Sequence, residues 1–237
     1  MTLFLSNFGE TRKLKAMRHH PDNQRIPCLR CRKSPRTCYC HLLRPFRSST
    51  QFVILQHPKE RRKAIGTARM VHLSMEGSEL RVGKEFDDDP VVSQYLKDES
   101  RHCVVLFPSE RSANLSTARE AGELDRWIPP GKNLVVFVLD GTWTQAKRIL
   151  ERSLKLARLP QVCFTVREKS QYRIRQQPED YCLSTLEAVT EVLNILETGA
   201  PVENLTQVFH SMVETQLGFS AYVKAPASIP SPAPAAL

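Results

Sequence analysis

The chain has 237 residues, 41% of them hydrophobic, which is enough for one large domain with a substantial core. No apolar stretch approaches the roughly 20 residues that a membrane helix needs, and the N-terminal segment MTLFLSNFGETRKLKAMRHH lacks the pattern of a secretory signal. These features exclude membrane-spanning and secreted classes, so we expect a cytoplasmic protein without membrane association.

The positive charge of the chain is unevenly distributed. Residues 1–47 hold 11 Lys/Arg and 2 Asp/Glu, whereas residues 48–237 hold 23 of each, so the net charge of +9 lies in the first fifth of the chain. A second basic stretch, residues 147–175, contains nine Lys or Arg and two Glu. Two basic regions predict binding to a polyanion, most often nucleic acid; the alternative is a solvated surface that keeps the protein soluble.

The first 47 residues divide into two predicted parts. Residues 1–25 are expected to form a basic, flexible arm, and residues 26–47 are too polar to build a core without help. The stretch CLRCRKSPRTCYC has the spacing C-x2-C-x6-C-x-C and supplies four cysteines within 13 residues: Cys28, Cys31, Cys38 and Cys40. Four thiolates over so short a span can converge on one tetrahedral zinc ion, which would fold this segment as a zinc knuckle.

Alternatives to the zinc site are four free or paired cysteines, or an iron–sulfur cluster. His41 is an alternative fourth ligand in place of Cys40. Four cysteines leave no open coordination position, so the metal is expected to be structural. The basic residues interleaved with them predict an RNA-contact surface: Arg30, Arg32, Lys33 and Arg36.

Strands and helices are expected to alternate from residue 48 to 220. Strands are predicted at 51–57, 79–83, 102–108, 133–140 and 161–166, and helices at 60–75, 142–157, 183–196 and 203–217. This rhythm, with strands that are apolar on both faces, indicates an α/β domain with a mostly parallel sheet and helices on both faces. Residues 221–237, rich in Pro and Ala, are expected to be a disordered tail.

Ligands of such sheets bind beyond the carboxyl ends of the strands, which directs attention to the stretch LDGTW at residues 139–143. Asp140 offers an acceptor, Gly141 would let a ligand approach the backbone, and Trp143 offers a stacking face. The alternatives are structural. Asp140 and Thr142 are both good helix caps, and Trp143 would serve equally well as a packing residue between helix and sheet.

A second candidate site lies at the start of the helix predicted at 183–196. Ser184 and Glu187 fit the S-x-x-E pattern of a capping box, and such a helix start can also bind a carboxylate or phosphate through its free N–H groups. The chain has no G-x-G-x-x-G, no P-loop and no zinc-deaminase signature. From the residues alone, the prediction is an α/β protein with a zinc knuckle, a strand-end site and affinity for polyanions.

Six motifs, in order along about residues 27–217, resemble the DTW-domain family. They are the cysteine cluster, LQHPKE followed by GTAR, LFPSE, LDGTWTQAKRI with the D-x-T-W of the family name, YRIRQQP, and LSTLEAV. A single D-x-T-W would be a weak signal, but six ordered motifs are specific. The family is similar to tRNA-uridine aminocarboxypropyltransferases, and the resemblance implies a SPOUT-like fold with a C-terminal knot.

The resemblance implies transfer of the 3-amino-3-carboxypropyl group of S-adenosylmethionine to N3 of a uridine in tRNA, with release of methylthioadenosine. Asp140 would accept or position the N3 proton, Trp143 would stack on uracil or adenine, and Thr142 completes the expected catalytic set. Lys147 and Arg148, with the knuckle, would grip the tRNA backbone. The expected residues for S-adenosylmethionine are Pro108, Ser109, Glu110, Leu139, Arg173, Arg175, Leu183, Ser184, Thr185 and Leu186.

Two other functions stay open at this stage. A SPOUT-like RNA methyltransferase would use the same substrate, and a non-catalytic zinc-containing RNA-binding factor would need only the knuckle. We expect a monomer with no protein partner.

Overall fold

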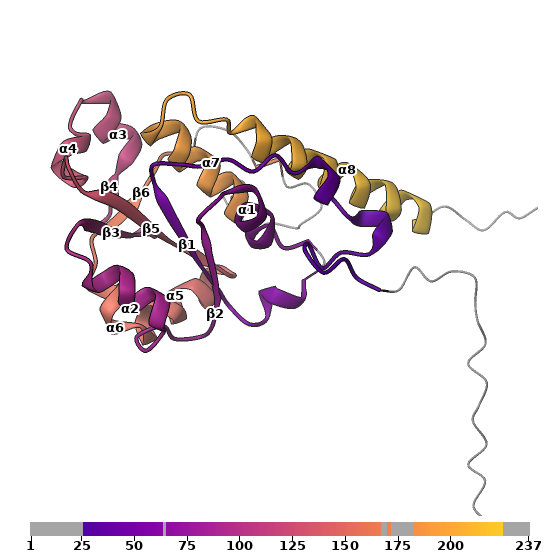
Figure 1. The fold of residues 1–237 in the computed structure, drawn as a ribbon, viewed down its shortest axis with the longest axis horizontal. Helices are drawn as coiled ribbons and strands as arrows, with labels where there is room; N and C mark the ends of the chain where they lie inside the picture. Colours follow the sequence, from indigo (N-terminus) through magenta and orange to yellow (C-terminus); the bar gives the residue numbers. More distant parts are fainter. Residues whose placement is uncertain (1–25, 64, 167–169, 172–182, 225–237) are drawn as a thin grey trace, which may run out of the picture.

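The computed structural model describes residues 26–63, 65–166, 170–171 and 183–224, with side chains up to residue 218. Its centre is one six-stranded sheet with the order β2-β1-β5-β3-β6-β4, and every pairing between neighbouring strands is parallel (Figure 1). The strands are β1 (Gln51–Gln56), β2 (Glu79–Val82), β3 (Arg101–Leu106), β4 (Ala113–Asn114), β5 (Asn133–Asp140) and β6 (Gln161–Cys163).

Helices cover both faces of the sheet, as expected for strands that are apolar on both sides (Figure 1). One layer contains α1 (Ala68–Ser74), α7 (Thr185–Leu196) and α8 (Glu203–Lys224), joined at one end by α3 (Leu115–Glu120) and α4 (Leu124–Trp127). The other layer contains α2 (Pro90–Lys97), α5 (Trp143–Arg152) and α6 (Leu154–Ala157). The prediction of an α/β domain with a mostly parallel sheet and helices on both faces is confirmed.

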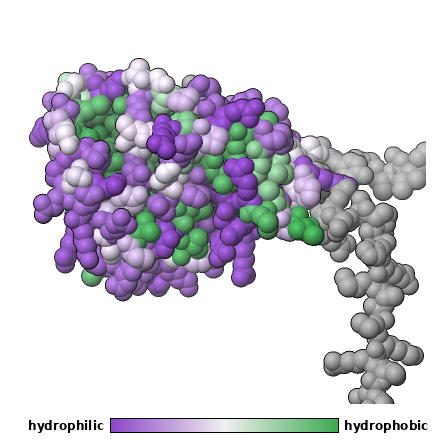
Figure 2. All heavy atoms as spheres, in the orientation of Figure 1, coloured by the Kyte–Doolittle hydropathy of each residue, from purple (hydrophilic) through white to green (hydrophobic). Residues whose placement is uncertain are grey.

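The two cores follow from side-chain alternation along the strands. In β5, Leu134, Val136 and Val138 pack into the α1/α7/α8 core, whereas Val135 and Phe137 pack into the α2/α5/α6 core. The face seen in Figure 2 is mostly hydrophilic, with hydrophobic side chains gathered in a few separate areas. The sheet therefore separates the molecule into two packed halves that meet only at its edges.

The segment predicted as a zinc knuckle, residues 26–47, packs onto the α1/α7/α8 core. It contains two short 3₁₀ helices, η1 (Pro35–Thr37) and η2 (Cys40–Leu42), and contributes buried Tyr39, Leu43 and Phe46 to that core. The DTW motif residues and the knuckle therefore belong to one continuous structure. The predicted arm, residues 1–25, lies outside the described residues.

Four predicted elements differ from the structure by more than two residues or by a break. The helix expected at 60–75 is divided into η3 (Glu60–Arg62) and α1, because Lys63 adopts an extended conformation. The helix expected at 142–157 is broken at Ser153 into α5 and α6. The strand expected at 161–166 ends at Cys163, and the last helix continues past residue 217 to Lys224, into the predicted tail. The C-terminal knot stays a prediction, because residues 167–169 and 172–182 lie outside the described residues.

Candidate active site and candidate metal centre

The carboxyl ends of β1, β5 and β3 lie side by side, since β5 is paired with both neighbours in parallel. Asp140 is the last residue of β5 and continues the row of Leu134, Val136 and Val138, so its side chain faces the α1/α7/α8 layer. Leu139 belongs to the alternate row and packs against the α2/α5/α6 core. The strand thus delivers a carboxylate to one face of the sheet edge and only an apolar side chain to the other.

Asp140 is buried, with 7% of its surface exposed. Its Oδ2 accepts a hydrogen bond of 2.9 Å from Nε2 of Gln56, the residue paired with it in β1. Its Oδ1 accepts a hydrogen bond from the hydroxyl of Thr185, at the start of α7. A buried carboxylate requires such donors, and these two come from different elements, β1 and α7. Asp140 therefore ties β1, β5 and α7 together and presents a fixed acceptor at the sheet edge.

Thr142 is the N-cap of α5. Its hydroxyl accepts a hydrogen bond from the backbone N–H of Gln145 at 3.3 Å, and the Gln145 side chain accepts one from the Thr142 N–H at 2.8 Å. A Cβ atom on Gly141 would lie 2.9 Å from Cβ of Gln145, so the glycine makes room for this capping box. The approach of a ligand to the Gly141 backbone stays a prediction, and helix capping alone accounts for the local position of Thr142.

Trp143 is the first residue of α5 and stacks on Phe107, which follows β3, with ring centroids 4.9 Å apart and an interplanar angle of 11°. Phe107 is buried in the α2/α5/α6 core, but 57% of Trp143 remains exposed. This exposure argues against a buried packing role. The indole lies on the opposite face of the sheet from the Asp140 carboxylate, and within the described residues no hydrogen bond joins the two.

The loop after β3 contains three of the residues expected to bind the substrate S-adenosylmethionine. Pro108, Ser109 and Glu110 are all exposed, and a shallow hollow is lined by Ser109, Glu110 and Arg111. The Ser109 hydroxyl lies 2.6 Å from the side-chain amide of Gln161, which fixes the loop to β6. The structure therefore places this loop at the carboxyl edge without enclosing a pocket there.

A cavity of about 280 Å³ lies between α7, α8 and the segment before α7. Two of the expected residues, Leu183 and Leu186, line it together with Thr190, Thr206 and Phe209. Thr190 is 7% exposed, and its hydroxyl has no hydrogen-bond partner in the described part of the chain. A buried polar atom without a partner is unfavourable, so the cavity offers an unused polar anchor in a lining of mixed apolar and polar side chains.

The capping box predicted at the start of α7 is present. The Ser184 hydroxyl accepts from the Glu187 N–H at 3.3 Å, and the Glu187 carboxylate accepts from the Ser184 N–H at 2.7 Å. Glu187 also accepts hydrogen bonds from the Ser170 hydroxyl at 2.9 Å and from the Gln171 N–H at 2.7 Å. This carboxylate therefore fixes both the helix start and the segment beside the cavity. Arg173 and Arg175 lie outside the described residues.

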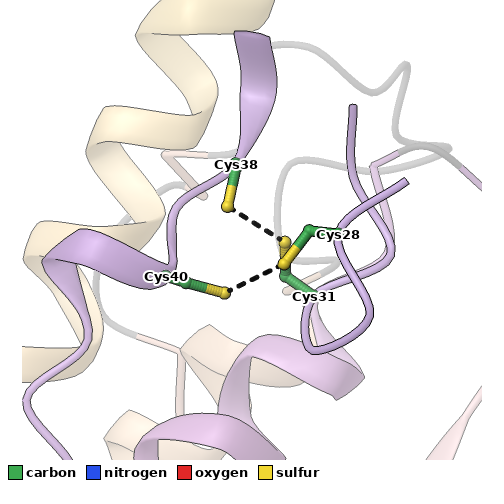
Figure 3. A group of neighbouring side chains, drawn as sticks. All are labelled: Cys28, Cys31, Cys38 and Cys40. Carbon is green, nitrogen blue, oxygen red and sulfur yellow. Dashed lines mark hydrogen bonds between the residues drawn. The ribbon is translucent and has the colours of Figure 1, made fainter. Parts of the chain in front are cut away.

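The four predicted metal ligands converge on one point (Figure 3). The Sγ atoms of Cys28, Cys31, Cys38 and Cys40 all lie within 4.8 Å of one another, with Cys28–Cys40 at 3.7 Å and Cys31–Cys38 at 3.6 Å. Four sulfurs bound tetrahedrally to zinc at about 2.3 Å would lie about 3.8 Å apart. The donor set therefore fits a zinc ion, and Cys40, not His41, completes it.

The backbone of the knuckle favours the thiolate form at one of the four cysteines, Cys28. Hydrogen bonds from the backbone N–H groups of Cys31 and Arg30 lower the pKa of the Cys28 thiol to about 6; burial opposes this shift, and hydrogen bonds with the Cys31 and Cys40 thiols add to it. Burial raises the pKa of the Cys31 thiol and raises that of Cys40 to about 12. The turn is closed by a 2.7 Å bond from the Arg32 N–H to the Cys28 carbonyl, with Arg32 in the left-handed region at φ 60°.

The residues predicted to contact RNA lie on two surfaces. Arg30, Arg32 and Arg36 are exposed on the knuckle and Lys33 is half-buried there, whereas Lys147 and Arg148 are exposed on α5. Sequence reasoning missed Gln56, Phe107 and Thr190. Gln56 and Phe107 stand at strand ends, which was a usable signal. Nothing in the sequence marks Thr190, because its position next to the cavity depends on how α7 and α8 pack.

The structure combines a parallel α/β sheet, a D-x-T-W motif at the carboxyl edge of that sheet, and a four-cysteine knuckle packed on one of its two cores. The model of the DTW domain family matches residues 25–217. The chain therefore belongs to the DTW-domain family. It is similar to proteins named tRNA-uridine aminocarboxypropyltransferase 2 from Drosophila melanogaster (35% identity, 83% of this chain and 77% of the relative) and Macaca fascicularis (31%, 86% and 68%).

A third relative, tRNA-uridine aminocarboxypropyltransferase A from Arabidopsis thaliana, is 27% identical over 87% of this chain and 84% of its own length. No solved structure matches the chain. Within the described residues, no helix combines the length and apolar character that crossing a bilayer requires.

Proposed function

We propose that this chain is a tRNA-uridine aminocarboxypropyltransferase that uses S-adenosylmethionine as its second substrate. The observation that carries the proposal is positional. The D-x-T-W residues lie at the carboxyl edge of a parallel sheet, where ligands of such sheets bind, in a chain that resembles relatives named for this reaction over more than four-fifths of its length.

The reaction forms a bond between uracil N3 and the γ-carbon of the aminocarboxypropyl group. The bond from that carbon to the sulfonium breaks, its electrons stay on sulfur as the thioether of methylthioadenosine, and the N3 proton is released. The enzyme must hold N3 in line with the γ-carbon and take up one proton, so positioning is the main demand. Asp140 is proposed to accept that proton or to fix the groups around it, because its acceptor oxygens are already oriented by Gln56 and Thr185.

We assign the two sides of the sheet edge to the two substrates. The cavity beside Leu183 and Leu186 would take the adenosine part of S-adenosylmethionine, with Thr190 as a polar contact. The exposed face of Trp143 would stack on a nucleobase, since Phe107 occupies its other face. Lys147 and Arg148 follow on the same helix, where they would hold the RNA backbone.

The zinc ion would be held by the four cysteines of the knuckle and would have a structural role, because no coordination position is left for a reactant. In Arg30, Arg32 and Arg36 the knuckle offers an exposed basic surface for tRNA. The proposed location is the cytoplasm.

The test is incubation of the metal-loaded protein with tRNA and S-adenosylmethionine, followed by mass analysis of the nucleosides. A uridine heavier by one aminocarboxypropyl group, with methylthioadenosine as co-product, supports the proposal. A methyl increment with S-adenosylhomocysteine would show methyl transfer by the same fold. Unchanged nucleosides, with tRNA binding intact across tRNAs from several sources, would instead indicate a non-catalytic RNA-binding factor.

A further inference from the structure

The segment that connects β1 to α1 is strongly basic. Between residues 57 and 69 it contains five Lys or Arg and a single acid, Glu60. Glu60 is only 4% exposed and pairs with the Lys63 ammonium at 2.6 Å, so its charge is turned inward and neutralised. Arg61 and Arg62 of η3 are exposed, and in the described part of the chain neither forms an ion pair. The segment therefore presents two guanidinium groups to solvent without a carboxylate partner.

This segment begins at the candidate active site. The backbone N–H of His57, the residue after β1, donates a 2.8 Å hydrogen bond to the carbonyl of Asp140. Burial lowers the pKa of the His57 imidazole, and the positive charges of Lys84, Lys59 and Arg148 lower it further against the opposing charge of Glu60. η3 therefore starts next to the strand-end site and next to the basic face of α5.

The same segment ends at the zinc knuckle. Arg69 of α1 donates from Nη1 to the carbonyl of Arg30 at 3.4 Å. Figure 1 shows η3 as a short violet turn between the carboxyl ends of β1 and β2 and the indigo segment of the knuckle. The sequence predicted two basic surfaces, one on the knuckle and one on α5. The basic segment around η3 lies between them and forms a third basic surface.

Like charges gather at this junction. Burial first, and then the positive charges of Arg32 and Arg61, lower the pKa of Arg69, and the charges of Tyr39 and Cys31 act in the opposite direction. Arg69 also lies near the Cys31 sulfur, so it helps to balance the negative charge of a metal-bound thiolate cluster. Holding guanidinium groups near other cations is unfavourable unless an anion binds between them.

We propose that Arg61 and Arg62, together with Arg32 of the knuckle, bind the phosphate backbone of tRNA where it passes from the knuckle to the strand-end site. Guanidinium groups form paired hydrogen bonds with phosphate oxygens, which suits them to this role better than isolated ammonium groups. This inference rests on the proposed function for the identity of the RNA. It adds a contact surface that neither the cysteine cluster nor the D-x-T-W motif indicates.

The test measures equilibrium binding of tRNA to the metal-loaded protein over a range of salt concentrations. The variant is Arg61→Ala/Arg62→Ala. The matched control is Lys97→Ala/Lys132→Ala, which also removes two exposed cations, next to the amino ends of β3 and β5 at the opposite edge of the sheet. The logarithm of the affinity falls linearly with the logarithm of the salt concentration, and each lost phosphate contact makes this slope less steep by about 0.7–0.9. The slope of the variant should therefore be less steep than that of the wild type by roughly 1.5.

The control should keep the wild-type slope, and Arg61→Lys/Arg62→Lys should recover most of it because the charges are restored. An unchanged slope in Arg61→Ala/Arg62→Ala, with thermal unfolding as in the wild type, would overturn the proposal, as would an equal loss in the control. Nucleoside analysis of the wild type is recorded in parallel. If the slope becomes less steep in Arg61→Ala/Arg62→Ala while the wild type leaves uridine unmodified, the proposed RNA contact stands and only the proposed reaction is overturned.

Discussion

Asp140 combines two properties that are rarely found in one residue without a functional reason: a buried carboxylate, and an acceptor at the open edge of a parallel sheet. Its strand-end position was predictable, because the apolar run before it fixes where β5 ends. Its partners were not, because Gln56 and Thr185 are 84 and 45 residues away in the chain and meet it only through strand register and helix packing. The sequence therefore indicated where the site lies, but not how the carboxylate is held.

Asp140→Asn tests whether the charge of this residue matters for transfer. The amide keeps the volume of the carboxylate and one acceptor, so the fold and tRNA affinity should be retained. If the residue takes up the N3 proton, the rate of transfer should fall by about 100-fold or more, within the usual range for a lost general base. Single-turnover rates and tRNA binding are measured on the same preparation.

Thr142→Ala serves as the comparison in that experiment. It removes a helix cap and should lower the free energy of unfolding by about 1 kcal/mol, with recovery in Thr142→Ser. If Asp140→Asn loses tRNA affinity in proportion to its rate, the carboxylate is a structural brace and the proton-acceptor role is wrong.

At the scale of elements, local sequence patterns predicted the long elements and failed where distant residues intervene. β5 was predictable because eight consecutive residues leave no ambiguity between strand and loop. The break between α5 and α6 was not. There the Ser153 hydroxyl accepts from the Phe86 N–H, and the Asp87 carboxylate accepts from the N–H groups of Leu154 and Lys155 and so starts a new helix. The helices α2, α3 and α4 have only 8, 6 and 4 residues, which is too short for a helical period to stand out.

The end of α7 is fastened to the segment before β1 by Glu197. Its carboxylate accepts hydrogen bonds from the Ser48 hydroxyl at 2.6 Å, the Thr50 N–H at 2.7 Å and the Ser49 N–H at 3.1 Å. Burial raises the pKa of Glu197, but these bonds outweigh burial, and the net pKa lies below its ordinary value of 4.5. This carboxylate links the two ends of the α/β unit, 147 residues apart.

Glu197→Gln should lower the free energy of unfolding at pH 7 by about 2 kcal/mol, because a charged acceptor is replaced by a neutral one. The folded-state pKa is below the unfolded value, so this contribution is fully present above about pH 4.5 and disappears as the pH falls through the lower folded value. Urea unfolding of both proteins at a series of pH values measures the difference. Glu99→Gln, an exposed control, should show no difference, and a gap between wild type and Glu197→Gln that persists at the lowest pH would contradict the assignment.

At the scale of the whole molecule, the knuckle is part of the main core. Cys31 is almost fully buried in the same cluster as Phe52 of β1 and Leu193 of α7. Loss of a metal bound by this cluster would therefore act on the packing of α1, α7 and α8 as well as on residues 26–47.

We expect the purified protein to contain one zinc ion per chain, and chelation to lower the midpoint of a single thermal transition followed by helix content. Cys31→Ser should reproduce that loss, whereas Cys103→Ser, outside the cluster, should keep the metal. Protein that contains no metal would refute the zinc site. Two separate transitions, with the helices unaffected by chelation, would show that the knuckle is energetically independent.

The separation of Asp140 and Trp143 by the sheet edge has a consequence for the order of events during turnover. In the proposed arrangement, S-adenosylmethionine enters from the α7/α8 side and the nucleobase from the α5 side, so neither blocks the path of the other. A buried pocket closed off by RNA would impose a compulsory sequence of binding and release. Two separate entrances instead favour random addition, and they allow methylthioadenosine to leave while the tRNA is still bound.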